Sequence, residues 1–175
     1  LSMIPLFDEY DRVLHLDSDM IISNDCPNLF EYVDEDKIGT IFEDKAPDFI
    51  IHRKNLMNQV QSEWGNVGWE KNYVNSGTFL VPKELKDVMS DHDGKYWLGW
   101  GAADVQHSYN IAKYDLPFQE LPYQFNHMSV FSREWNGNAN KYDSYIIHEA
   151  GGGAQAGKAN SIRSSINTWS GMGKL

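Results

Sequence analysis

Two aspartates separated by a single residue, Asp17 and Asp19, follow a largely apolar run at 13–16, and apolar residues resume at 20–22. Two carboxylates at the end of a buried strand are costly unless a cation neutralises them. Residues i and i+2 of a strand point the same way, so both carboxylates can converge on one ion. Because hard divalent cations prefer oxygen ligands, the pair predicts a Mn²⁺ or Mg²⁺ site.

Three other interpretations of the pair of aspartates can be compared with a metal site of this kind. A calcium loop of the EF-hand type needs a third acidic residue at its fifth position and Gly at its sixth, and Ile21 and Ile22 stand there instead, which excludes it. A haloacid-dehalogenase-like phosphatase, which forms an aspartyl phosphate, also places Asp-x-Asp after an apolar strand, but the later acidic pair it needs is not evident. An ordinary acidic turn at the end of a strand binds nothing. The spacing alone leaves the last two open.

Length, charge and cysteine content narrow the class of protein. The 175 residues suit one domain, and no apolar run is long enough to predict a membrane span. The formal net charge of −10 disfavours nucleic acid and anionic lipid as partners. The single Cys26 excludes an internal disulfide and is compatible with a reducing, cytoplasmic compartment.

The elements that must position the aspartates alternate between strand and helix. Strand patterns occur at 12–16, 38–42, 78–82 and 144–147, and a weaker one at 118–121. Helix patterns occur at 25–33, 52–63, 83–91, 102–113 and 160–169. Asp25 is the expected N-cap of the first helix. Loops are expected at 92–101 and at the glycine-rich 149–159. The alternation predicts an α/β fold, a mostly parallel or mixed sheet flanked by helices.

Four stretches in order along residues 8 to 170 resemble the family-eight glycosyltransferases, the group of glycogenin and lipopolysaccharide galactosyltransferase. They are "DRVLHLDSDMIISNDCPNLFEY", "YVNSGTFLV", "GAADVQHSYNIA" and "YIIHEAGG". The resemblance implies the Rossmann-like, A-type glycosyltransferase fold. It also implies transfer of a hexose from a nucleotide-diphosphate sugar, with UDP-sugar as the favoured donor, to a hydroxyl acceptor. In such an enzyme a divalent cation bridges the carboxylates to the departing diphosphate.

The resemblance implies a set of metal and phosphate contacts. Asp17 and Asp19 correspond to the carboxylate ligands, Asp17 also touching the donor, and His148 corresponds to the imidazole ligand. The family commonly places a phosphate-binding Lys six residues after this His. Here Ala154 stands in that position, and Lys158 is the nearest lysine able to reach the diphosphate.

The resemblance also implies contacts with the donor sugar. Asn75, Ser76 and Gly77 correspond to a segment beside that sugar, and Gly77 would permit close approach of the backbone. The alternative is an ordinary turn before the strand at 78–82, because Asn and Gly both favour turns.

On the acceptor side, Asp104 is the candidate catalytic residue, although Val follows it where the family usually has Gln. In inverting enzymes a carboxylate here takes the proton of the acceptor hydroxyl, whereas retaining enzymes leave this to the phosphate, and the overall pattern mildly favours retention. Trp97 and Trp100, in the loop before Asp104, are candidate platforms for stacking against a sugar.

Family members place several βα units before the Asp-x-Asp strand, whereas only ten residues precede Asp11 here. One βαβ unit takes about 30 residues or more. We therefore expect a single domain, 1–175, that forms the C-terminal portion of the fold without its first nucleoside-binding units. A non-catalytic relic that binds sugar or metal is the alternative function.

Overall fold

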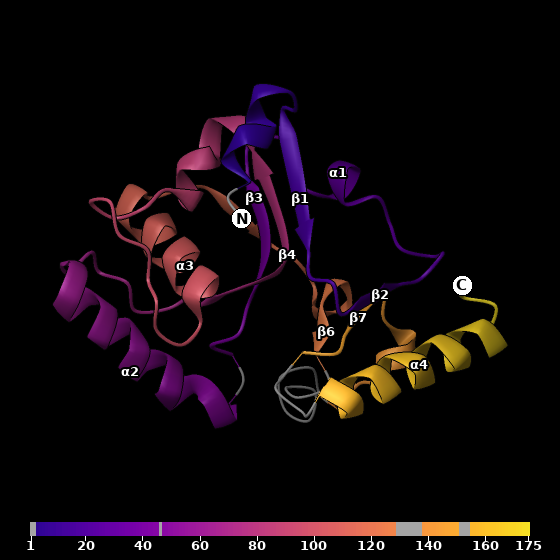
Figure 1. Ribbon diagram of the computed structural model, residues 1–175. Coiled ribbons are helices and arrows are strands. Elements are labelled where there is room, and N and C mark those ends of the chain that lie inside the picture. Colours follow the sequence, from indigo (N-terminus) through magenta and orange to yellow (C-terminus); the bar gives the residue numbers. More distant parts are fainter. Residues whose placement is uncertain (1–2, 46, 129–137, 151–154) are drawn as a thin grey trace.

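Two β-sheets form the centre of the computed structural model, which describes residues 3–45, 47–128, 138–150 and 155–175 (Figure 1). The strands are β1 (Arg12–Leu16), β2 (Met20–Ile22), β3 (Ile38–Phe42), β4 (Val74–Pro82), β5 (Phe118–Glu120), β6 (His127–Met128) and β7 (Ile146–His148). The α-helices are α1 (Leu29–Tyr32), α2 (Pro47–Trp64), α3 (Ala102–Tyr114) and α4 (Gln155–Gly171). Short 3₁₀ helices cover Ile4–Asp8, Lys83–Met89, Tyr123–Phe125 and Lys141–Asp143.

Both sheets are mixed. The larger has the order β1-β4-β3-β5, in which β4 is antiparallel to β1 and β3 while β5 is parallel to β3. The smaller has the order β2-β7-β6, with β7 antiparallel to β2 and parallel to β6. All residues of β3 and β4 are buried, because these central strands are covered on both faces. The predicted class, a mixed α/β sheet flanked by helices, is confirmed.

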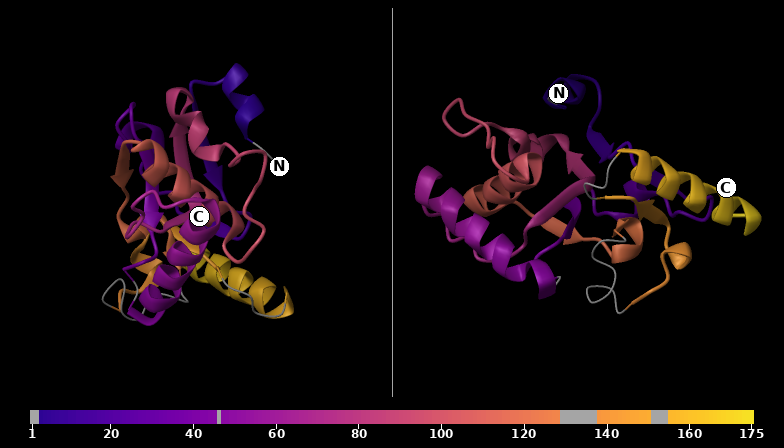
Figure 2. Two further views of the ribbon diagram at one scale, coloured as in Figure 1. Left: turned by 90° about the vertical axis from the view of Figure 1, so that its left-hand side faces the viewer. Right: turned by 60° about the horizontal axis from the view of Figure 1, so that its bottom comes forward.

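The helices cover different sheets. Helices α2 and α3 lie together on one side of the larger sheet, whereas α4 lies beside the smaller one (Figures 1 and 2). Val60 of α2 packs in one cluster with Val105 and Tyr109 of α3. Trp169 of α4 is fully buried against Ile21 and Ile147. Within the described residues, no helix is long and apolar enough to cross a membrane.

Every predicted strand is present, with three changes of extent, the smallest being that β5 ends at Glu120 and not at position 121. Strand β4 begins at Val74, so the Asn-Ser-Gly segment lies inside the strand and is not a turn before it. The pattern at 144–147 corresponds to β7 at Ile146–His148. Strands β2 and β6 were not predicted, since they are only three and two residues long and depend on pairing with β7.

The helix predictions need three corrections. The N-cap of the first helix is Asn28, whose side chain accepts the N–H of Phe30 at 3.1 Å, whereas Asp25 lies in the preceding turn. The helix expected at 83–91 is a 3₁₀ helix over Lys83–Met89. The end of the glycine-rich stretch expected as a loop is already helical, because α4 begins at Gln155. Positions 151–154 of that stretch lie outside the described residues.

Candidate metal centre

The two aspartates stand in the turn that joins β1 to β2, where the chain leaves the larger sheet and enters the smaller one. They follow β1 as predicted, but the alternation of side chains along a strand does not explain their convergence, because neither aspartate lies within a strand. The turn is held on both sides. The N–H of Asp17 donates to the carbonyl of Gly77 in β4 at 3.0 Å, and Asp19 precedes Met20, which pairs with His148 of β7. This register brings His148 beside the turn.

Asp17, Asp19 and His148 converge as a candidate metal site. The Nε2 atom of His148 lies 3.3 Å from Oδ1 of Asp19 and 3.6 Å from Oδ2 of Asp17. One ligand atom from each of the three residues lies within 4.8 Å of the others. Two carboxylates and one imidazole form a three-ligand set of the kind that holds a divalent cation and leaves positions open to solvent or substrate.

The protonation states suit metal binding. Burial lowers the pKa of His148, although Asp19 and Asp17 oppose this, so its neutral form is favoured. The pKa of Asp17 is also lowered, mainly because His15 hydrogen-bonds its Oδ1 at 3.0 Å. Metal ligands must be deprotonated, and both shifts act in that direction.

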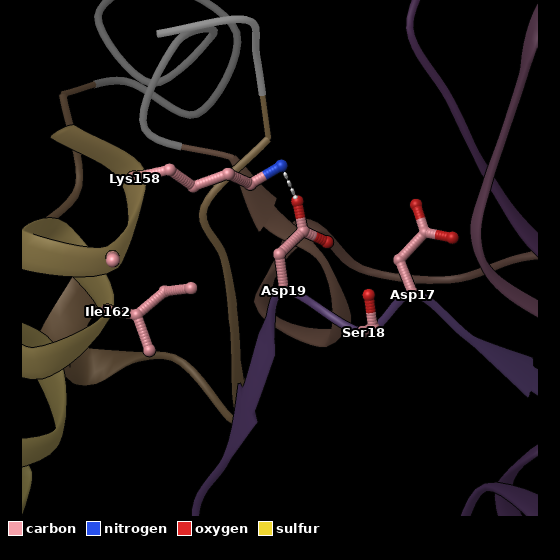
Figure 3. A pocket seen from close by; sticks show the side chains of 6 residues that line it. Asp17, Ser18, Asp19, Lys158 and Ile162 are labelled. Carbon is pink, nitrogen blue, oxygen red and sulfur yellow. Dashed lines mark ion pairs between the residues drawn. The ribbon is translucent and has the colours of Figure 1, made fainter. Parts of the chain in front are cut away.

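Lys158 extends from α4 to the carboxylate of Asp19. Figure 3 shows its side chain extending from the helix toward Asp19, with which its ammonium forms an ion pair. A cavity of about 480 Å³ opens here, lined by Asp17, Ser18, Asp19, Lys158, Ala159 and Ile162. The structure thus places a cationic side chain against the carboxylate pair, on a helix and not on the expected loop.

Gly77 of β4 lies directly against the histidine. A Cβ atom added to Gly77 would lie 2.7 Å from Cε1 of His148 and 2.8 Å from both Oδ1 of Asn75 and Cε of Met20. Such separations are shorter than van der Waals contact, so a side chain at this position would have to displace the ring. The absence of a side chain at Gly77 thus lets the backbone of β4 lie close to His148, and its expected contact with the donor sugar stays a prediction.

A chain of buried polar side chains extends from His148 into the larger sheet. Nδ1 of His148 lies 2.7 Å from Oδ1 of Asn126, whose Nδ2 donates to Oδ1 of Asn75 at 2.8 Å. Nδ2 of Asn75 donates to Oε1 of Glu43 at 2.5 Å, and Nε of Arg53 donates to Oε2 of Glu43 at 2.8 Å. Asn126, Glu43 and Arg53 are not among the site residues that the sequence predicted. Glu43 directly after the buried strand at 38–42 was the one visible signal.

Asp104 lies in the first turn of α3, next to β4. Its Oδ1 accepts the backbone N–H of Ser76 at 2.8 Å and the Ser76 hydroxyl at 2.6 Å. Burial, reinforced by the charge of Glu43, raises the pKa of Asp104 to about 7 in spite of these two donors. A carboxyl group with this pKa can both hold and release a proton near neutral pH.

The two candidate tryptophans differ in exposure. Trp97 is buried, and its indole N–H donates to the carbonyl of Trp100 at 3.1 Å, so it is not an exposed stacking platform. Trp100 is 54% exposed, and the guanidinium carbon of Arg53 lies 4.2 Å from its ring centroid. Of the two, only Trp100 offers a ring surface to a ligand.

No protein-family model matches the chain, and no curated protein matches it. Solved structures do match, among them the apo structure of WbbM, a bifunctional glycosyltransferase. The TM-score is 0.49 at 14% sequence identity, and the match covers 86% of this chain and 30% of that chain. This chain therefore spans less than a third of that structure, and a likeness of this size does not assign it to a family.

Proposed function

We propose that the chain is the metal-binding part of a glycosyltransferase with the A-type fold, which moves a hexose from a nucleotide-diphosphate sugar to a hydroxyl acceptor. A UDP-sugar is the donor we favour. The observation that carries the proposal is the convergence of Asp17, Asp19 and His148 beside a solvent-open cavity. A diphosphate is the kind of ligand that such a site binds, because a cation can join its oxygens to the two carboxylates.

The donor set fits Mn²⁺ better than Mg²⁺. Mg²⁺ is bound mainly through oxygen atoms, whereas first-row transition metals also accept the Nε2 atom of an imidazole such as His148. When bound, the cation would supply Lewis-acid stabilisation to the departing diphosphate. Asp17 and Asp19 would hold it from the turn, and His148 would hold it from β7.

Lys158 would bind the diphosphate. In the structure its ammonium is paired with Asp19, which partly offsets the charge of the two carboxylates. A divalent cation would take over that role, and the lysine would then be available to donate to phosphate oxygens on the same side of the cavity. The same residue would thus pair with Asp19 in the metal-free protein and with the bound substrate.

The residues that we assign to the sugar come from β4, from the start of α3 and from the loop before α3. We assign Asn75, Ser76 and Gly77 to the donor sugar, and Trp100 to stacking against a sugar face. Asp104 holds or accepts a proton on the acceptor side. In an inverting reaction it would take the proton of the acceptor hydroxyl, and in a retaining reaction, which we favour, the leaving phosphate would take that proton.

The decisive experiment is titration of the chain with Mn²⁺, followed by assay of UDP-hexose hydrolysis. We expect Asp19→Ala and His148→Ala to abolish both saturable Mn²⁺ binding and Mn²⁺-dependent hydrolysis. His92→Ala is the matched histidine control, because His92 stacks against Trp64 and is not part of the cluster of Asp17, Asp19 and His148, so its loss should change neither. Unchanged Mn²⁺ affinity in His148→Ala would contradict the proposal. Binding of Mn²⁺ and UDP-hexose without turnover would instead fit a non-catalytic relic.

A further inference from the structure

We propose that Asn126 is a positioning residue that sets the tautomer of His148, with the hydrogen on Nδ1 and the lone pair of Nε2 directed at the two aspartates. Asn126 is itself oriented by Asn75 and Glu43. This inference rests on the proposed metal site, which gives the orientation its purpose. It can nevertheless be tested on the metal-free protein, because the tautomer exists without the ion.

The direction of the hydrogen-bond chain is determined at its far end. The guanidinium of Arg53 carries donors only, so Glu43 must accept from its Nε. The other oxygen of Glu43, Oε1, faces the amide of Asn75 at 2.5 Å. A carboxylate oxygen only accepts, so Asn75 must present its NH₂ group to Glu43 and its oxygen to the opposite side.

A second donor independently fixes the same orientation. The backbone N–H of Gly77 donates to Oδ1 of Asn75 at 3.0 Å, so this atom must be oxygen. The atom of Asn126 that lies 2.8 Å from the same oxygen must therefore be its NH₂ nitrogen. That assignment leaves the oxygen of Asn126 facing His148 at 2.7 Å, and an oxygen acceptor requires a hydrogen on Nδ1.

A hydrogen on Nδ1 of His148 determines what the other ring nitrogen, Nε2, can bind. In the neutral ring a hydrogen on Nδ1 leaves Nε2 with a lone pair, at 3.3 Å from Asp19 and 3.6 Å from Asp17. An acceptor nitrogen facing two acceptor carboxylates is unfavourable until a cation lies between them, and it is then a prepared ligand. The opposite tautomer would aim an N–H at Asp19 and would have to lose that hydrogen before binding metal.

The hydrogen-bonded series of side chains from His148 to Arg53 is rigid. All five members are buried, with exposed fractions of 7% or less. They come, respectively, from β7, the segment before β6, β4, the position directly after β3, and α2: His148, Asn126, Asn75, Glu43 and Arg53. Buried polar networks whose members are satisfied hold their side chains in one arrangement. The larger sheet and α2 thereby hold the histidine ring that stands in the smaller sheet.

The test is ¹⁵N NMR of the histidine ring in metal-free protein at pH 8, combined with Mn²⁺ titration. We expect the His148 signals of a hydrogen-bearing Nδ1 and an unprotonated Nε2. Asn126→Leu removes the acceptor at similar size, so the hydrogen should move to Nε2. Mn²⁺ affinity should fall about 10- to 100-fold, the usual loss when the partner of a ligating histidine is removed.

The control is Asn110→Leu, because Asn110 is also fully buried and its Nδ2 donates to the carbonyls of Ser90 at 2.8 Å and Val88 at 3.0 Å. This variant should lose stability but keep the wild-type tautomer and Mn²⁺ affinity. Asn126→Asp, which keeps an oxygen toward His148, should keep the hydrogen on Nδ1.

The wild-type spectrum alone can overturn the proposal, whether or not the variants fold. A hydrogen on Nε2 in the metal-free wild-type protein would refute it, as would an unchanged tautomer in folded Asn126→Leu. The expected tautomers without any Mn²⁺ binding would support the role of Asn126 and refute the metal site, so the two failures are distinguishable.

Discussion

The raised pKa of Asp104 predicts that its carboxyl group destabilises the folded protein increasingly as the pH rises from about 4 to about 7. Its ordinary value is 3.8 and its folded-state pKa is about 7. Between these values the unfolded chain has released the proton while the folded state still holds it. The free energy of unfolding therefore falls with pH across this window and becomes independent of this group above it. About three pKa units at 1.36 kcal/mol each give about 4 kcal/mol.

Asp104→Asn isolates this contribution. An asparagine oxygen can accept the same two hydrogen bonds from Ser76 that Oδ1 of Asp104 accepts, but the amide carries no charge to desolvate. The stability of the variant relative to wild type should therefore rise between pH 4 and pH 8, by an amount on the order of 4 kcal/mol.

Urea unfolding at several pH values, followed by tryptophan fluorescence in the presence of EDTA, measures the difference. Subtracting the free energies of unfolding of the two proteins removes the contributions of titrating groups that do not interact with Asp104, because both chains share them. Asp34→Asn is the control, since the Asp34 carboxylate is exposed and paired only with Lys37 among the described residues. Its difference from wild type should not follow the same curve. A flat difference between Asp104→Asn and wild type from pH 4 to pH 8 would refute the reasoning.

Three further substitutions test the site by calorimetric titration. Gly77→Ala should weaken Mn²⁺ binding at least about tenfold, because its Cβ would displace the ring of His148, whereas Gly157→Ala, whose Cβ meets nothing within 4 Å, should not. Lys158→Met should strengthen Mn²⁺ binding, because it removes the ammonium that pairs with Asp19. It should also weaken UDP binding, because that ammonium would bind the diphosphate. Weaker Mn²⁺ binding in this variant would contradict the first expectation. Trp100→Ala should lower the affinity for UDP-hexose without changing the affinity for Mn²⁺. An unchanged affinity for UDP-hexose would exclude the stacking role.

Local patterns were sufficient for the strands and helices with strong periodicity, such as β3 and α3. They were insufficient where an element depends on its partner. Strand β2 exists because Met20–Ile22 pairs with β7, more than 120 residues away in the chain. The first helix begins at Leu29, after its N-cap Asn28 and not directly after Asp25, because the side chain of Asn28 accepts the N–H of Phe30. Several residues are equally suited to capping, and the local geometry selects one.

For the site, the sequence by itself determined the chemistry of the ligands. The spacing of Asp17 and Asp19 indicated a cation, and the resemblance added His148. The tertiary structure alone decided that the three converge, and that Asn126 and Glu43 stand behind the histidine. The reason is physical: the partners of a buried amide or carboxylate are set by the register and packing of strands distant in the chain. Such contacts leave no periodicity in the sequence.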